Sequence, residues 1–216
     1  MRICFFGDSF VNGTGDDEAL GWPGRLVAAA RHRGLDVTYY NLGIRRDTSD
    51  EIAARWHDEA QRRLPPRCNP RLAFSFGTND CAPSDTGEAR VPHDRSLENA
   101  KSILQIARTL APTLMIGPPP IFHDADANMR LRELSLGLDQ LCRRLSVPFL
   151  ETATFISQCE PWRREADSGD GAHPNKEGYA ALSEHVAAWP HYERWLSGQP
   201  SVLSAHSAFL FFPRNP

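Results

Sequence analysis

The sequence predicts an α/β protein in which a parallel β-sheet is covered by helices on both faces. Short apolar runs alternate along the chain with longer segments whose apolar residues recur at helical spacing. This β-α alternation occurs five times, and such an order favours parallel strands joined by right-handed crossovers. The 216 residues contain no internal repeat, and their number fits one domain or at most two.

The predicted strands are short runs of strand-forming residues, and the first four stop at a glycine. They cover residues 3–6, 37–43, 72–77, 113–117 and 147–150. The first run, Ile3-Cys4-Phe5-Phe6, is apolar throughout, which is typical of a strand buried on both faces.

The predicted helices lie between these runs. One extends over about Gly24–His32, and the next follows a Thr48-x-x-Glu51 capping box, which marks a helix N-terminus. A third follows the polar loop from Pro83 to Asp94, and its apolar positions are Leu97, Ile103, Leu104 and Ala107. The last two cover about Arg130–Leu145 and Lys176–Trp189. Residues 1–196 are interpreted as one domain, and residues 197–216 as a tail with an apolar patch at 208–212.

Composition excludes several classes of partner. The formal charge of −3 gives no electrostatic reason to expect binding to nucleic acid or to an anionic membrane. No run of 18 apolar residues exists, so no membrane span is expected. The first residues lack the pattern of a secretory signal, and the five cysteines are scattered without a CxxC motif. We therefore expect a cytoplasmic protein.

The residues with reactive or unusual side chains follow the carboxyl ends of the predicted strands. Ser9 follows the first strand, Gly43 ends the second, Asn79 follows the third, and the loop with Asp170 and His173 comes after the fifth. In open α/β sheets the ligand site lies beyond the carboxyl ends of the strands. We therefore expect these residues to lie near one another.

Their chemistry fits nucleophilic catalysis. A serine hydroxyl becomes nucleophilic when a base takes its proton, and His173 is the best base because imidazole titrates near neutral pH. Asp170, three residues earlier, is placed to accept the Nδ1 proton of that ring. The backbone N–H groups of Ser9 and Gly43 and the side-chain amide of Asn79 are the natural oxyanion donors.

Each residue also has a purely structural interpretation. Asn79 and Gly43 are common turn residues, and Asp8 and Asp80 are read as carboxylates that bond loop backbone. Cys81 is an alternative nucleophile, and His123 is a candidate for lining the pocket because it follows the proline run at 118–120. A metallophosphoesterase is a rival class, but Gly-Asp-Ser stands where such an enzyme has a GDxH block, and no GNH[DE] block occurs.

At these residues the sequence resembles the SGNH hydrolases, also called the GDSL esterase/lipase family. The family has four sequence blocks, and all four have matches here in the same order: Gly7-Asp8-Ser9-Phe10, Gly43, Gly77-Thr78-Asn79-Asp80 and Asp170-Gly171-Ala172-His173. The resemblance covers residues 1 to about 195. It implies a flavodoxin-like three-layer α/β/α sandwich with a five-stranded parallel sheet in the order 2-1-3-4-5.

The resemblance also implies a function. Ser9 would be the nucleophile, His173 the base and Asp170 its partner, with Ser9, Gly43 and Asn79 forming the oxyanion hole. Such enzymes hydrolyse esters and thioesters without a cofactor or metal. Because no long apolar lid is evident, we expect small soluble ester substrates; a catalytically silent binding protein on the same fold is the alternative.

The sequence departs from the family pattern beside Gly43. Phe10 replaces the usual Leu, and Arg45 and Arg46 stand where many relatives have small residues. One interpretation pairs these arginines with Asp16, Asp17 or Asp47 as solvated ion pairs. The other makes Arg45 and Arg46 substrate-binding residues that hold a carboxylate or phosphate.

Overall fold

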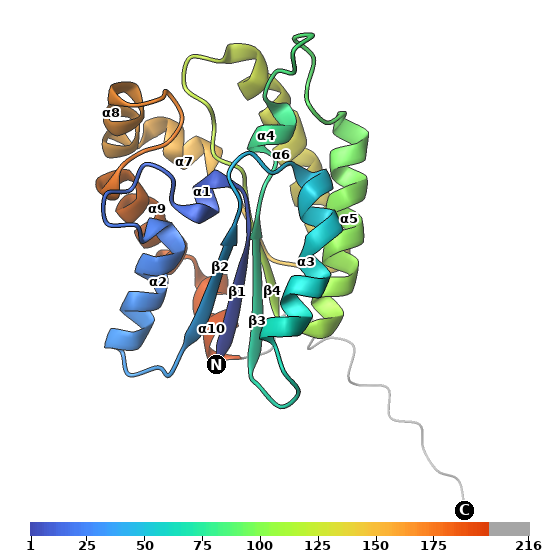
Figure 1. Ribbon diagram of the computed structural model, residues 1–216, viewed down its shortest axis with the longest axis vertical. Helices are drawn as coiled ribbons and strands as arrows, with labels where there is room; N and C mark the ends of the chain where they lie inside the picture. Colours follow the sequence, from blue (N-terminus) through green and yellow to red (C-terminus); the bar gives the residue numbers. More distant parts are fainter. Residues whose placement is uncertain (199–216) are drawn as a thin grey trace, which may run out of the picture.

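The computed structural model describes residues 1–198, which form a five-stranded parallel sheet with helices on both faces (Figure 1). The strand order is β2-β1-β3-β4-β5 and every neighbouring pair is parallel. The sequence-based expectation of a three-layer sandwich with this order is therefore confirmed. The predicted apolar patch at 208–212 lies outside the described residues.

The strands are β1 (Arg2–Gly7), β2 (Thr38–Gly43), β3 (Pro70–Ser75), β4 (Thr113–Ile116) and β5 (Phe149–Leu150). The helices are α1 (Ser9–Asn12), α2 (Gly21–His32), α3 (Ser49–Arg63), α4 (Thr78–Cys81), α5 (His93–Leu110), α6 (Ala125–Leu145), α7 (Ala153–Gln158), α8 (Glu160–Ser168), α9 (Lys176–Ala188) and α10 (Pro190–Ser197). No helix within residues 1–198 is both long and apolar enough to cross a membrane.

Two hydrophobic cores lie on opposite faces of the sheet. Successive side chains of a strand point to opposite faces, so Cys4 and Phe6 of β1 enter one core and Ile3 and Phe5 the other. Helices α3, α5 and α6 cover the first face, and α2, α8, α9 and α10 cover the second (Figure 1). Burial of β1 on both faces agrees with its uninterrupted apolar run.

Several element boundaries differ from the sequence-based expectations. Helix α6 begins at Ala125 rather than near Arg130, because the Asp124 side chain accepts a hydrogen bond from the Ala127 N–H and caps the helix there. Strand β5 has only two residues, and α7 and α8 occupy a stretch for which the sequence analysis predicted no helix. The capping box at Thr48 and Glu51 was predicted and is present.

The carboxyl ends of β1 and β2 are fixed to each other by a buried network. Gly7 and Gly43 are partners in the register of the two strands. The Arg55 guanidinium, reaching up from α3, donates to the backbone carbonyls of Gly7 (3.1 Å) and Leu42 (2.9 Å) and also pairs with Asp47. The loops that leave both strands therefore start from fixed positions.

Candidate functional site

Ser9 begins the short helix α1 at the carboxyl end of β1, an interior strand of the sheet. The Asp8 carboxylate caps this helix by accepting a hydrogen bond from the Phe10 N–H at 3.0 Å. The turn requires a glycine before it, because a Cβ atom on Gly7 would lie 2.1 Å from the Ser75 carbonyl oxygen. The first N–H groups of a helix have no acceptor within it, so the Ser9 N–H is available to a ligand.

The structure brings His173 to Ser9 across 164 positions of sequence. The His173 Nε2 and the Ser9 Oγ are 2.7 Å apart, and on the other side of the ring the Nδ1 lies 2.7 Å from Asp170 Oδ2. The second carboxylate oxygen of Asp170 accepts hydrogen bonds from the backbone N–H groups of Ala172 and His173. The three residues form a continuous serine–histidine–aspartate chain of hydrogen bonds.

The Asp170 carboxyl is held in its ionised form. Partial burial works to raise its pKa, but the hydrogen bonds from the backbone and ring of His173 outweigh that effect and lower the pKa to about 2. A carboxylate at this position orients the imidazole so that Nε2 is free to accept the serine proton. The electrostatics of the pair therefore agree with its geometry.

The loop that carries His173 is anchored from two sides. Glu165 of α8 accepts hydrogen bonds from the backbone N–H groups of Asn175 (2.9 Å) and Gly178 (2.8 Å). The ring of Phe10 lies against the imidazole, with their centroids 4.7 Å apart. Phe10 itself is buried and stacks on Trp162. The substitution of Phe for Leu at position 10 therefore places an aromatic ring directly behind the candidate base.

The predicted oxyanion donors are not equally free. The Asn79 Nδ2 donates one hydrogen bond to the Asp47 carbonyl (3.0 Å), which holds the amide in place and leaves its second N–H available. The Gly43 N–H, in contrast, donates to the Asn41 Oδ1 at 3.1 Å. Asn41 also donates to the Val11 carbonyl, so it joins β2 to α1. In this structure an oxyanion would have to share the Gly43 N–H with Asn41.

A glycine at position 43 has a steric cause of its own. A Cβ atom there would lie 2.2 Å from the Asn12 nitrogen and 2.6 Å from the Asp8 carbonyl oxygen. Any side chain would push α1, and Ser9 with it, away from the sheet. The predicted oxyanion role of Gly43 remains a prediction, whereas its role in letting α1 pack against β2 follows directly from these distances.

A cavity of about 500 Å³ opens over the serine. It is lined by Ser9, Arg45, Arg46, Asn79, Ala82, Pro83, Arg90 and His173. The expectation that Arg45 and Arg46 pair with Asp16, Asp17 or Asp47 is wrong for the described residues: Asp16 pairs with Arg25, Asp47 pairs with Arg55, and Asp17 accepts a hydrogen bond from Asn175. Arg45 instead lies 3.8 Å from Asp170.

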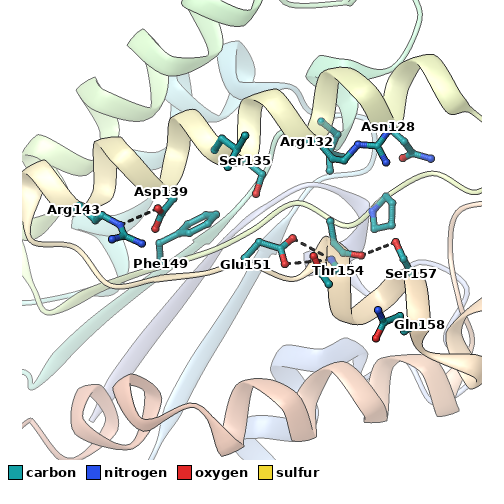
Figure 2. Close-up of a pocket in the computed structure, with 14 residues that line it drawn as sticks. Asn128, Arg132, Ser135, Asp139, Arg143, Phe149, Glu151, Thr154, Ser157 and Gln158 are labelled. Atoms are coloured by element: carbon teal, nitrogen blue, oxygen red, sulfur yellow. Dashed lines mark hydrogen bonds and ion pairs between the residues drawn. The ribbon is translucent and has the colours of Figure 1, made fainter.

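A second cavity, of about 640 Å³, lies between α6 and the segment that runs from β5 into α7 (Figure 2). Two interactions join residues of its wall: Arg143 pairs with Asp139, and Glu151 accepts a hydrogen bond from the backbone N–H of Thr154. It shares no lining residue with the cavity over Ser9. Although it is larger, it lacks the serine and histidine that give the first cavity its chemistry.

The alternatives raised by the sequence do not gain support. Burial raises the pKa of the Cys81 thiol to about 12, so it is not a thiolate near neutral pH. His123 does not line the cavity over Ser9 but lies 2.8 Å from Asp167. Within residues 1–198 no three His, Cys, Asp or Glu side chains are grouped so that they could hold a metal ion.

Asp8 gives a prediction for the pH dependence of stability. Its carboxyl is buried and Oδ2 has no hydrogen-bond partner among the described residues. Burial raises its pKa to about 7, well above the value of about 3.9 expected in the unfolded chain. Between these values the folded state binds more protons than the unfolded state, so the free energy of unfolding falls as pH rises through this range.

We therefore expect Asp8→Asn to remove part of the fall in wild-type stability between pH 4 and pH 7. Asparagine keeps the acceptor for the Phe10 N–H but carries no titrating proton. Urea unfolding at several pH values measures the difference, and Asp85→Asn, at an exposed position in the loop after α4, is the control. Parallel stability curves for wild type and Asp8→Asn would contradict the expectation.

A doubly wound α/β fold with a serine–histidine–aspartate chain at the carboxyl edge of its sheet defines a class of hydrolase. The family model described as GDSL-like lipase/acylhydrolase matches residues 5–181, which is most of the chain. The chain belongs to this family, whose members are serine ester hydrolases.

Solved structures show the same fold at low sequence identity. One is a lipase/acylhydrolase from Enterococcus faecalis, with a TM-score of 0.72, 21% identity and coverage of 91% of this chain and 96% of that one. Another is the acetylxylan esterase Axe2 from Geobacillus stearothermophilus, with a TM-score of 0.69, 18% identity and coverage of 85% and 90%. The search of curated proteins found no match.

The sequence reasoning missed three residues that shape the site. Arg90 comes from the polar loop after α4, and nothing in its local sequence indicates that it reaches the cavity. Asn41 and Glu165 hold the strand end and the histidine loop. For Asn41 the sequence did contain a signal, because a polar residue within a run of strand-forming residues needs hydrogen-bond partners.

Proposed function

We propose that this protein is a serine esterase or acylhydrolase that cleaves carboxylic esters or thioesters of small soluble substrates. The observation that carries the proposal is the hydrogen-bonded chain from Ser9 Oγ through His173 to Asp170, with 2.7 Å at each of its two links. The structures of Axe2 include catalytic mutants at a serine, an aspartate and a histidine, and in that protein too the aspartate precedes the histidine by three positions.

The proposed reaction proceeds through an acyl-enzyme. The His173 Nε2 takes the hydroxyl proton while the Ser9 Oγ attacks the carbonyl carbon, and the carbonyl oxygen becomes an oxyanion. His173 then gives this proton to the leaving alcohol or thiol as its bond to the acyl carbon breaks. A water molecule, deprotonated by His173, attacks the acyl-enzyme and releases the acid together with free Ser9.

The oxyanion is assigned to the Ser9 N–H and the second N–H of Asn79, with the Gly43 N–H shared between the oxyanion and Asn41. Such donors contribute most when they are fixed before the reaction begins. The Asp47 carbonyl fixes Asn79, and the cap at Asp8 fixes the start of α1. The size of the cavity, about 500 Å³, suits a small ester.

Hydrolysis of p-nitrophenyl esters from acetate to palmitate tests the proposed function. We expect turnover to be fastest for short acyl chains and to fall steeply for long ones. Preferred hydrolysis of palmitate would reject the small-substrate part of the proposal. No turnover of any ester, together with no labelling by a fluorophosphonate probe, would favour a silent binding protein on the same fold.

Asn79→Ala is expected to lower kcat by about 10²–10³, the loss typical when one oxyanion donor is removed. The hydrogen bond to the Asp47 carbonyl is lost as well, so a thermal melt must show that the variant is folded. Gln158→Ala, at an exposed position in the second cavity, is the control and should keep full activity (Figure 2). A folded Asn79→Ala variant with less than a fivefold loss in kcat would remove Asn79 from the oxyanion hole.

A further inference from the structure

The wall of the active-site cavity is cationic. Its eight lining residues include three arginines, Arg45, Arg46 and Arg90, and no aspartate or glutamate. This contrasts with the whole chain, whose formal charge is −3. We propose that the ester substrate carries an anionic oxygen-acid group, a carboxylate or a phosphate, that these arginines bind. The inference rests on the proposed function and narrows its substrate class.

A hydrogen bond to the backbone joins the two loops that carry the arginines. Arg46 adopts a left-handed conformation with φ of 74°, which is unusual for a residue with a side chain. The Arg90 guanidinium donates to the Arg46 carbonyl at 3.1 Å and so connects the loop after α4 to the loop after β2. The next carbonyl along the chain, that of Asp47, accepts from Asn79. The arginines and the candidate oxyanion donor therefore belong to one connected rim.

The nearby carboxylates all have partners other than these three arginines. Asp47 is occupied by Arg55, and Glu51 accepts hydrogen bonds from the backbone and hydroxyl of Thr48. Asp170 lies 3.8 Å from Arg45, and its oxygens also accept three hydrogen bonds from residues 172 and 173. The Arg45 side chain is 62% exposed, so it can turn towards an incoming anion at little cost.

Arginine is suited to this task because its guanidinium offers several donors in one plane and binds carboxylate or phosphate through two oxygens. Ser9 and the three arginines line the same cavity, so a charged group bound by the arginines would lie close to the ester carbonyl. Binding at this distance from the reacting carbon acts on ground state and transition state alike, so its loss should appear mainly in KM.

Matched ester pairs test the proposal. For charge on the acyl side, mono-p-nitrophenyl glutarate is compared with p-nitrophenyl butyrate; for charge on the leaving group, 4-acetoxybenzoate is compared with its methyl ester. A third arm, 4-acetoxyphenyl phosphate, distinguishes phosphate from carboxylate. We expect the wild type to prefer the charged member of at least one pair by about tenfold in kcat/KM, and added salt to reduce that preference by screening.

Arg90→Gln and Arg45→Gln should each lower the ratio of charged to neutral kcat/KM by about five- to tenfold, mainly through KM. Arg90→Lys keeps the charge and should restore much of the ratio. The control is Arg132→Gln, an arginine of the second cavity, which should change neither the ratio nor the rates (Figure 2). A purely structural role for Arg90 would slow both esters equally and leave the ratio unchanged.

The proposal is overturned if, for every pair, the wild type has the same kcat/KM for the neutral ester as for the charged one. It is also overturned if the arginine variants keep the wild-type ratio of charged to neutral kcat/KM. In either case measurable, Ser9-dependent turnover of the neutral esters would leave the proposed function intact. If no ester of either kind is hydrolysed and the fluorophosphonate probe labels nothing, the proposed function itself has failed, and the substrate inference falls with it.

Discussion

Ser9→Ala is expected to reduce ester hydrolysis by about 10⁴–10⁶, which is the range for removal of the nucleophile from a serine hydrolase. In the proposed mechanism the Ser9 Oγ forms the acyl-enzyme, and among the described residues no second nucleophile lines the cavity. The Cys81 thiol, the alternative considered from the sequence, is buried and has a raised pKa. Initial rates with p-nitrophenyl acetate measure the loss.

Loss of activity in Ser9→Ala must be separated from loss of the fold. The Ser9 Oγ makes a single hydrogen bond, to the His173 Nε2, and the backbone around it does not depend on that bond. Its removal should therefore leave the thermal midpoint within a few degrees of wild type. Ser102→Ala, on the exposed face of α5, is the matched control and should keep full activity. Labelling of Ser9→Ala by a fluorophosphonate, or residual turnover above a tenth of wild type, would place the nucleophile elsewhere.

Asp170→Asn is expected to lower kcat by about 10²–10⁴ while leaving the loop intact. Asparagine can still accept the two backbone N–H bonds from Ala172 and His173, but it cannot stabilise an imidazolium or hold the ring in one tautomer. The Asp170 side chain is 44% exposed, so water partly screens its charge from the imidazolium. The lower end of the range takes this screening into account. Steady-state kinetics on a short-chain ester gives the measurement.

The pH profile adds a second test of Asp170. With a pKa of about 2, the carboxylate stays ionised above about pH 3, so it should not produce the acid limb of activity between pH 4 and pH 8. Asp170→Asn should therefore lower the plateau of that profile. Asp167→Asn, three positions earlier and paired with His123, is the control. Wild-type kcat in Asp170→Asn would show that His173 needs no carboxylate partner.

The sheet was predictable from sequence because its strands carry their own signals. The buried strand β1 is apolar from Ile3 to Phe6 and ends at Gly7. The edge strand β2 ends at Gly43, which is required sterically where α1 packs on β2. The convergence of Ser9, Asn79 and His173 followed from the rule that places sites beyond the carboxyl ends of strands. Order along the chain was enough to bring these residues to one edge.

Other features depend on tertiary contacts that no local pattern encodes. In β5 only Phe149 and Leu150 pair with β4, although the apolar run predicted a strand from residue 147. Helix α8 was not predicted, although its Trp162 is fully buried behind Phe10. The sequence also could not show that Arg45 pairs with Asp170 or that Arg90 lines the cavity. An exposed arginine can form an ion pair with any of several acidic residues, and only the fold determines which one is near.

The distance along the chain between Ser9 and His173 has a consequence for biosynthesis. Strand β1 and the serine that follows it leave the ribosome first, whereas the histidine follows only after the other four strands have been made. A nascent chain that ends before Asp170 has every strand of the sheet but no base for the serine. If the proposed function holds, hydrolysis therefore becomes possible only when translation of the chain has passed His173.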